Sequence, residues 1–217
     1  MTTLKLKDKF SHLLEESAAY HTHVCPRQVL GVRMGLYAGQ LLGFEAPQAD
    51  KRIFTFIETD GCFLDGVAVS TGCAAGRRTM RVVDFGKMAA TFVDSLTEQA
   101  IRLSPHSGAR KSCQEYAPGA QDRWHAYLVG YQEMPDNQLF QVQPVQLAVP
   151  LKVLLCREKM RSICARCGEE IFNEREVQVD GIVLCQACAG QSYYSVTDPV
   201  CKETFTRIRE LSDRLDR

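Results

Sequence analysis

The chain has 217 residues, of which 45% are hydrophobic and 24% are charged, and this is the composition of an ordinary globular protein with one large or two small domains. Its 26 Lys and Arg residues balance 26 Asp and Glu residues, which argues against binding of nucleic acid or an anionic membrane by bulk charge. No apolar run approaches the roughly 20 residues of a membrane span, and residues 1–10 lack the apolar stretch of a secretory signal. We expect a cytoplasmic protein without a membrane partner.

Apolar spacing predicts a mixture of helices and strands as far as residue 155. Helices are expected over residues 7–20, 26–42, 62–73 and 124–134. The second of these has Pro26 at its first position and Gly43 as its stop. Strands are expected over residues 52–58, 81–85, 89–94 and parts of 140–155. Residues 104–121 are polar and rich in Pro and Gly, which predicts a loop.

Three glycines, Gly31, Gly35 and Gly39, recur at four-residue spacing on the second predicted helix. Each costs about 1 kcal/mol relative to Ala in a helix interior. A row of three therefore indicates that another backbone approaches this face closely. The sequence leaves two interpretations open, a packing seam within the chain and a contact between two copies.

Four of the ten cysteines form a group near the C-terminus. Cys164 and Cys167 make one Cys-x-x-Cys pair, and Cys185 and Cys188 make a second pair after 17 residues. This spacing is typical of one tetrahedral zinc with four thiolate ligands, whereas a redox dithiol pair and chance spacing are the alternatives. Because thiolates fill all four positions, such a zinc is structural rather than catalytic.

The composition changes near residues 156–161, which predicts a second domain over 158–217 with the zinc finger and then an amphipathic helix over 201–217. Between Cys164 and Cys188 the finger carries two arginines against five acidic residues. That balance disfavours a phosphate backbone as partner. We therefore expect a protein partner for the finger rather than nucleic acid.

A second group of metal-ligand types, His21, His23 and Cys25, alternates along the chain just before Pro26. In an extended segment all three side chains lie on one side, and Cys25 stands at a helix start, where the macrodipole lowers the pKa of a thiol. Histidine and thiolate together suit zinc and other transition metals. The alternative is a solvated loop.

Two further cysteines follow glycines, Cys62 after Gly61 and Cys73 after Gly72. They either complete a core site with the His21 to Cys25 segment or are small buried core residues, as cysteines often are. Asp60 and Lys87 are the remaining candidates for this site. Arg77 and Arg78 with Lys87 form either an anion site or a solvated face.

Several ordered motifs resemble the FmdE family, whose name comes from formylmethanofuran dehydrogenase. They are His21-Thr-His23-Val-Cys25-Pro26, Gly31-Val-Arg33, Asp60-Gly-Cys62, Thr71-Gly72-Cys73-Ala-Ala-Gly76-Arg77 and Asp84-Phe-Gly86-Lys87-Met-Ala89. The Cys164 to Cys188 block is similar to the DksA/TraR type of zinc finger. The chain departs from the family pattern at Thr22 and Arg27, where glycine is usual, and at Ala74, where threonine is usual.

The resemblance implies an α+β core over residues 1–157, with helices packed on a mainly antiparallel sheet, that often forms an intertwined homodimer. It also implies a cleft in which the matching histidines and cysteines gather. The candidate ligands of a second transition metal there are His21, His23, Cys25, Cys62 and Cys73. Cys25, His23 and Lys87 are the candidate catalytic residues.

Two classes of function are compatible with these features. The first is a zinc-binding protein that acts as a metal-dependent enzyme or accessory subunit, with the core metal as Lewis acid or with Cys25 as nucleophile or redox group. The second is a regulatory, metal-sensing or protein-binding module that acts through the zinc finger. No P-loop, GxGxxG or Ser-His-Asp pattern points to a particular reaction.

Overall fold

The computed structural model describes residues 3–19, 21, 23–155 and 160–195, with the side chains of residues 7 onward. The chain divides into two compact units, Met1–Leu151 and Lys152–Arg217. The helix expected over 201–217 lies outside the described residues. Within the described part, no helix is long and apolar enough to cross a membrane.

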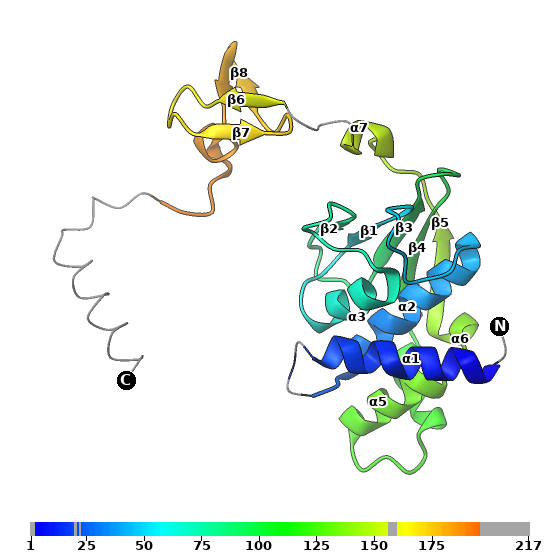
Figure 1. Ribbon diagram of the computed structural model, residues 1–217. Coiled ribbons are helices and arrows are strands. Elements are labelled where there is room, and N and C mark those ends of the chain that lie inside the picture. The colour runs from blue at the N-terminus through cyan, green and yellow to red at the C-terminus, as the bar shows by residue number, and fades with distance from the viewer. Residues whose placement is uncertain (1–2, 20, 22, 156–159, 196–217) are drawn as a thin grey trace, which may run out of the picture. The chain divides into compact units, whose positions relative to one another are not determined.

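The first unit contains a five-stranded sheet in the order β2-β1-β3-β4-β5 (Figure 1). Its strands are β1 (Ile53–Ile57), β2 (Met80–Val82), β3 (Ala90–Asp94), β4 (Ala100–Pro105) and β5 (Phe140–Pro144). Only the β1–β2 pair is parallel, and the other three pairs are antiparallel. The predicted α+β class with a mainly antiparallel sheet is therefore confirmed.

The strand β4 was not expected from the sequence, because the charged Arg102 interrupts its apolar pattern. In the sheet, the guanidinium of Arg102 binds both carboxylate oxygens of Glu58, at 2.6 and 2.7 Å. Bidentate pairing of this kind satisfies a charge at a half-buried strand position. The loop expected over 104–121 also contains two short helices, α4 (Ala109–Ser112) and η1 (Cys113–Tyr116).

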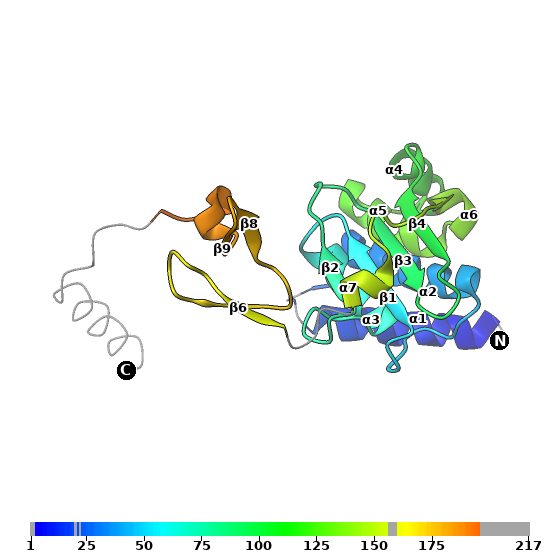
Figure 2. The same ribbon diagram turned by 90° about the horizontal axis from the view of Figure 1, so that it is seen from above.

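Helices α1 (Thr3–Ala18), α2 (Pro26–Leu42) and α3 (Cys62–Thr71) lie on one side of the sheet, and α1 packs against both α2 and α3 (Figures 1 and 2). The predicted bounds of α2 are confirmed. It starts at Pro26 and ends before Gly43, whose φ of 70° is the left-handed conformation of a helix stop.

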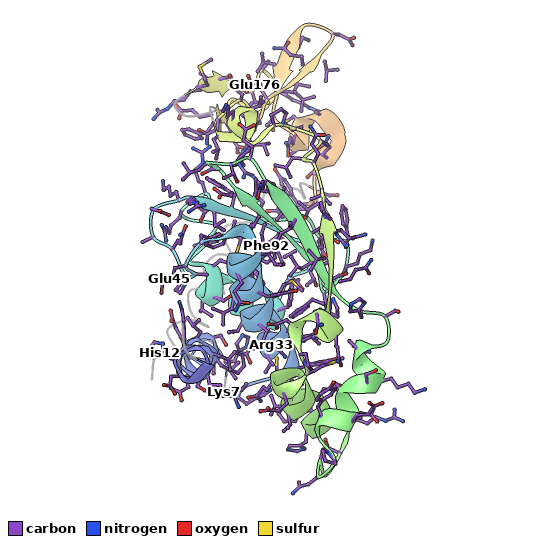
Figure 3. All side chains as sticks on the ribbon, turned by 90° about the vertical axis from the view of Figure 1, so that its right-hand side faces the viewer. Lys7, His12, Arg33, Glu45, Phe92 and Glu176 are labelled. Carbon is purple, nitrogen blue, oxygen red and sulfur yellow. The ribbon has the colours of Figure 1, made fainter. Side chains whose placement is uncertain are left out.

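Helix α5 (Arg123–Glu133) packs beside α2, and the short helix α6 (Asp136–Leu139) contacts β5. Arg33, labelled in Figure 3, connects α2 to them. Its guanidinium donates to the carbonyl oxygens of Tyr131, at 2.7 Å, and of Met134, and it forms an ion pair with Asp136.

The glycine row on α2 is a seam within the chain. A Cβ placed on Gly31 would lie 2.3 Å from the carbonyl oxygen of Phe63, and one placed on Gly66 of α3 would lie 2.5 Å from that of Gln28. A Cβ on Gly35 would meet Ser70 of α3 at 2.0 Å. The first two contacts are backbone against backbone, so α2 and α3 approach closely only because these positions lack side chains.

The core of the first unit lies between the sheet and α2 and α3. Its fully buried side chains include Phe92 of β3, labelled in Figure 3, together with Phe63, Met34 and Leu103. This layer joins the strands to the two helices from which the candidate core site is built.

The described part of the second unit contains most of the short helix α7 (Leu151–Leu155), two short hairpins and a terminal turn. Its other elements are β6 (Arg161–Ile163), β7 (Glu170–Phe172), β8 (Val177–Val179), β9 (Ile182–Leu184) and η2 (Ala187–Gln191). β6 pairs with β7 and β8 with β9, both antiparallel. Asp180 and Gly181 make the second hairpin turn with φ values of 50° and 78°, as Asp-Gly at a tight hairpin predicts.

Candidate metal centres

The four cysteines of the second unit converge on one point. The sulfurs of Cys164, Cys167, Cys185 and Cys188 all lie within 4.8 Å of one another, and those of Cys167 and Cys185 are 3.9 Å apart. Zinc at about 2.3 Å from each of four tetrahedral sulfurs separates the sulfurs by roughly 3.8 Å. These thiols therefore fit a single zinc ion.

The backbone around the cluster holds the sulfurs in place. Gly168, with φ of 76°, donates to the carbonyl oxygen of Cys164 at 2.9 Å and so closes the first knuckle. The amide of Cys188 donates to the sulfur of Cys185 at 3.4 Å in the second knuckle. N–H···S bonds of this kind favour thiolates.

The pKa values in this cluster diverge. Hydrogen bonds from the backbone amides of Cys167 and Cys185 lower the pKa of Cys164 to about 6. A hydrogen bond with Cys185 and then burial raise the pKa of Cys188 to about 12. Several thiolates this close repel one another, so all four ionise together only beside a cation. The donor set thus fits zinc in chemistry as well as distance, and it leaves no position for a substrate.

The core holds a second arrangement of ligand types, between the starts of α2 and α3. His21 Nε2 lies 2.8 Å from Asp65 Oδ2, and His21 Nδ1 lies 3.9 Å from Cys62 Sγ. Burial raises the pKa of the Cys62 thiol, and a hydrogen bond with Cys25 raises it further. Asp65, His21, Cys62 and Cys25 therefore form one continuous series of contacts.

Both cysteines of this series lie at the N-terminal end of a helix. Cys25 is the residue before α2, and its amide donates to the side-chain oxygen of Gln28 at 2.7 Å. The side-chain nitrogen of Gln28 donates to the carbonyl oxygen of Ser17 at 3.0 Å. Gln28 is fully buried, so it ties the His21 to Cys25 segment to α1. Cys62 is the first residue of α3.

Cys73 does not join this series. It follows the C-terminal end of α3, whereas Cys62 begins it, and ten helical residues span about 15 Å. The Cys73 thiol donates to the carbonyl oxygen of Ile53 at 3.3 Å, and burial raises its pKa. Cys73 therefore cannot share an ion with Cys62, and its surroundings are those of a neutral core cysteine.

His23 and Lys87 are both exposed. The ring centroid of His23 lies 6.2 Å from that of Trp124, at the start of α5. Lys87 lines a cavity to which His21, His23, Cys25 and Cys62 do not contribute. Within the described residues, the four-cysteine cluster is the one group of three or more ligand atoms mutually within 4.8 Å, and the core residues meet in pairs.

Arg77 and Lys87 line different cavities and so do not form one anion site. Arg77 donates to the carbonyl oxygens of Gly72 and Ala49 and lines a different cavity, which also contains Cys73. Its role there is to tie two loops together.

Sequence reasoning missed two residues of the core site. Gln28 stands three residues after the helix-preceding Cys25, which is the position of the glutamine in a capping box. Asp65 follows Cys62 by three residues on a helix, and that spacing places both side chains on one face. Both signals were present in the sequence.

Two family models match the chain. The model described as FmdE, Molybdenum formylmethanofuran dehydrogenase operon, matches residues 20–141. The prokaryotic DksA/TraR C4-type zinc finger model matches residues 159–194. The first match contains every candidate residue of the core site, and the second contains all four clustered cysteines.

A curated relative and a solved structure are also similar. A probable S-adenosyl-L-methionine-binding protein of Archaeoglobus fulgidus is 29% identical over 212 residues, which cover 88% of this chain and 56% of the relative. The chain thus spans little more than half the length of that protein. The crystal structure of a tungsten formylmethanofuran dehydrogenase FmdE-like protein from Syntrophus aciditrophicus matches with a TM-score of 0.56 and 19% identity, over 86% of this chain and 95% of that one. It shows the same fold.

Proposed function

Because this chain belongs to the FmdE family, we propose that it is a metal-dependent enzyme or accessory subunit that acts at the core site of His21, Cys25 and Cys62. The finger binds zinc, and its four thiolates give that zinc a structural role. The reactive chemistry is therefore assigned to the core.

The observation that carries the proposal is the contact series from Asp65 through His21 to Cys62. A histidine that binds a metal through one ring nitrogen commonly donates its other N–H to a carboxylate, which fixes the tautomer and the ring orientation. Asp65 at 2.8 Å from Nε2 leaves Nδ1 of His21 facing the sulfur of Cys62. That orientation suits an ion held between imidazole and thiolates.

The residues of this site would select and shield such an ion. An imidazole with two thiolates favours zinc and other borderline or soft cations over magnesium or calcium. Cys25 is 8% exposed, so its side of the site excludes water. A cation bound by three protein ligands supplies Lewis acidity at its open position.

The experiment is metal analysis of the full chain by plasma mass spectrometry after reconstitution with excess zinc. Two metals per chain are expected, and Cys62→Ser should retain one. Cys73→Ser is the matched control and should retain both, because Cys73 lies beyond the opposite end of α3. One metal per chain in the wild type, or two in Cys62→Ser, would contradict the proposal. Titration of the reconstituted protein with S-adenosyl-L-methionine would test whether the archaeal relative's named ligand also binds here.

A second candidate function, binding of a partner protein through the finger, is favoured by the apolar surface of the second unit. Ile163 is 63% exposed, Ile182 52% and Tyr193 97%. Such residues on an acidic module fit a protein better than a nucleic acid. A gel-shift titration that finds salt-sensitive binding to nucleic acid would oppose this candidate.

We also propose a homodimer, on the basis of family membership. Light scattering coupled to size-exclusion chromatography should give twice the chain mass of 24.3 kDa. A monomer at micromolar concentration would oppose this assignment.

A further inference from the structure

A cavity of about 460 Å³ lies where β4 ends. Its walls come from several elements, and they include Leu30 of α2, Met88 and Ala89 before β3, Pro105 of β4 and Tyr131 of α5. Small-molecule sites commonly occupy cavities of about 300–1,000 Å³, and five of the eleven residues that line this one are apolar or aromatic. No residue of the zinc cluster or of the His21 site lines this cavity.

The polar side of the cavity is basic. Lys87, Arg102, His106 and Arg110 line it, and its lining contains no carboxylate. Arg102 is neutralised by Glu58 through two hydrogen bonds. Among the described residues no carboxylate forms an ion pair with Lys87 or Arg110. The cavity therefore carries an excess of two positive charges without counting His106.

Local contacts restrain both of these cations. The backbone amide of Lys87 donates to the carbonyl oxygen of Glu58 at 3.0 Å, and its ammonium lies 5.8 Å from the centre of the Phe85 ring. The Arg110 guanidinium lies 5.7 Å from the centre of the Tyr127 ring. Tyr127 in turn stacks on Tyr131, with ring centroids 5.9 Å apart. An aromatic face holds a cation without neutralising it.

We propose that this cavity binds a small organic anion, in which a carboxylate or phosphate group is attached to an apolar body. Lys87 and Arg110 bind the anionic group, while Leu30, Met88 and Tyr131 contact the apolar body. The Glu58–Arg102 pair links the residue after β1 to β4 across the intervening β3, and so fixes Arg102 in the wall of the site. Ammonium and guanidinium groups bind both carboxylates and phosphates.

The test is calorimetric titration of the full chain, at low salt, with benzoate, phenyl phosphate and the neutral benzyl alcohol. At least one anion should bind, benzyl alcohol should not, and the affinity should fall with added salt. The anion that binds more tightly identifies the class of ligand.

Variants locate the binding. Lys87→Met and Arg110→Gln should each weaken binding about tenfold, which corresponds to about 1.4 kcal/mol for the loss of one charge-assisted contact. Lys111→Met is the matched control, an exposed lysine next to Arg110 that does not line the cavity, and it should change affinity less than twofold. Absence of binding by both anions, or equal weakening by Lys111→Met, would overturn the proposal and identify these cations as a solvated surface.

Discussion

Replacement of Gly31 by Ala tests the close approach of α2 and α3. A Cβ at this position would lie 2.3 Å from the Phe63 carbonyl oxygen, 2.9 Å from the Val67 amide nitrogen and 3.0 Å from Cα of Gly66. All three neighbours are backbone atoms, so no side chain can rotate away. The helices must separate by about 1 Å. A gap of this size removes a quarter to a half of the van der Waals attraction of each atom pair across the interface.

The expected result is the difference between two opposing effects. Alanine gains about 1 kcal/mol in helix propensity over glycine. Overpacking costs about 1–3 kcal/mol, or more where backbone must shift, and the separation loosens Phe63 and Val67, both fully buried. Because the clash is with backbone we place the cost at the upper end of that range, and expect a net loss of about 1–2 kcal/mol in the free energy of unfolding of the first unit, which corresponds to a fall of roughly 2–8 °C in its Tm.

The assay is thermal unfolding followed by circular dichroism. Gly76→Ala is the matched control, because a Cβ there meets no atom within 4 Å, and its Tm should be unchanged. A Gly31→Ala Tm equal to or above that of the wild type would refute the reasoning, since the propensity gain would then have no opposing clash.

Three further predictions concern pH, metal and a buried glutamine. A hydrogen bond from Arg52 lowers the pKa of buried Asp94, so this carboxylate stabilises the fold above pH about 4, and that contribution is lost as pH falls through the lowered pKa. Asp94→Asn should lower the free energy of unfolding by about 2–3 kcal/mol at pH 7. In urea unfolding its stability should also fall less steeply with acid than that of the wild type, and an unchanged acid dependence would contradict this. Removal of zinc by a chelator should unfold the second unit and leave the Tm of the first unit unchanged. Amide exchange follows the second unit, and retention of protection at β6 to β9 would oppose a zinc-dependent fold. Gln28→Ala should leave the Cys25 amide and the Ser17 carbonyl without these partners. The free energy of unfolding should fall by about 2–4 kcal/mol. A fall below about 1 kcal/mol in urea unfolding would show that these hydrogen bonds are dispensable.

Features determined by local chemistry could be predicted from the sequence. The bounds of α2 follow from Pro26, which cannot extend a preceding helix, and from Gly43, which adopts the left-handed stop. The zinc cluster follows from two Cys-x-x-Cys turns, because each turn places two sulfurs on one ion whatever the rest of the chain does.

Features determined by residues far apart in the chain could not be predicted from the sequence. The strand β4 was not predicted, because Glu58, the residue that compensates the charge of Arg102, comes from the segment after β1, more than 40 residues earlier. The sequence left open whether Cys73 is a core-site residue or a buried core cysteine for the same reason, since the carbonyl oxygen to which its thiol donates belongs to Ile53 of β1. The choice between a seam and a dimer contact at Gly31 also required the position of α3.

The glycine contact has a consequence for the core site. Gly31 comes six residues after Cys25, and Gly66 comes four residues after Cys62, so the crossing of the two helices lies close to both thiols. The separation of the two sulfurs is then determined by the distance between two rigid helices rather than by a loop. For the core metal proposed above, a substitution at the crossing would favour a larger ion without altering any ligand, because it would move the two sulfurs apart.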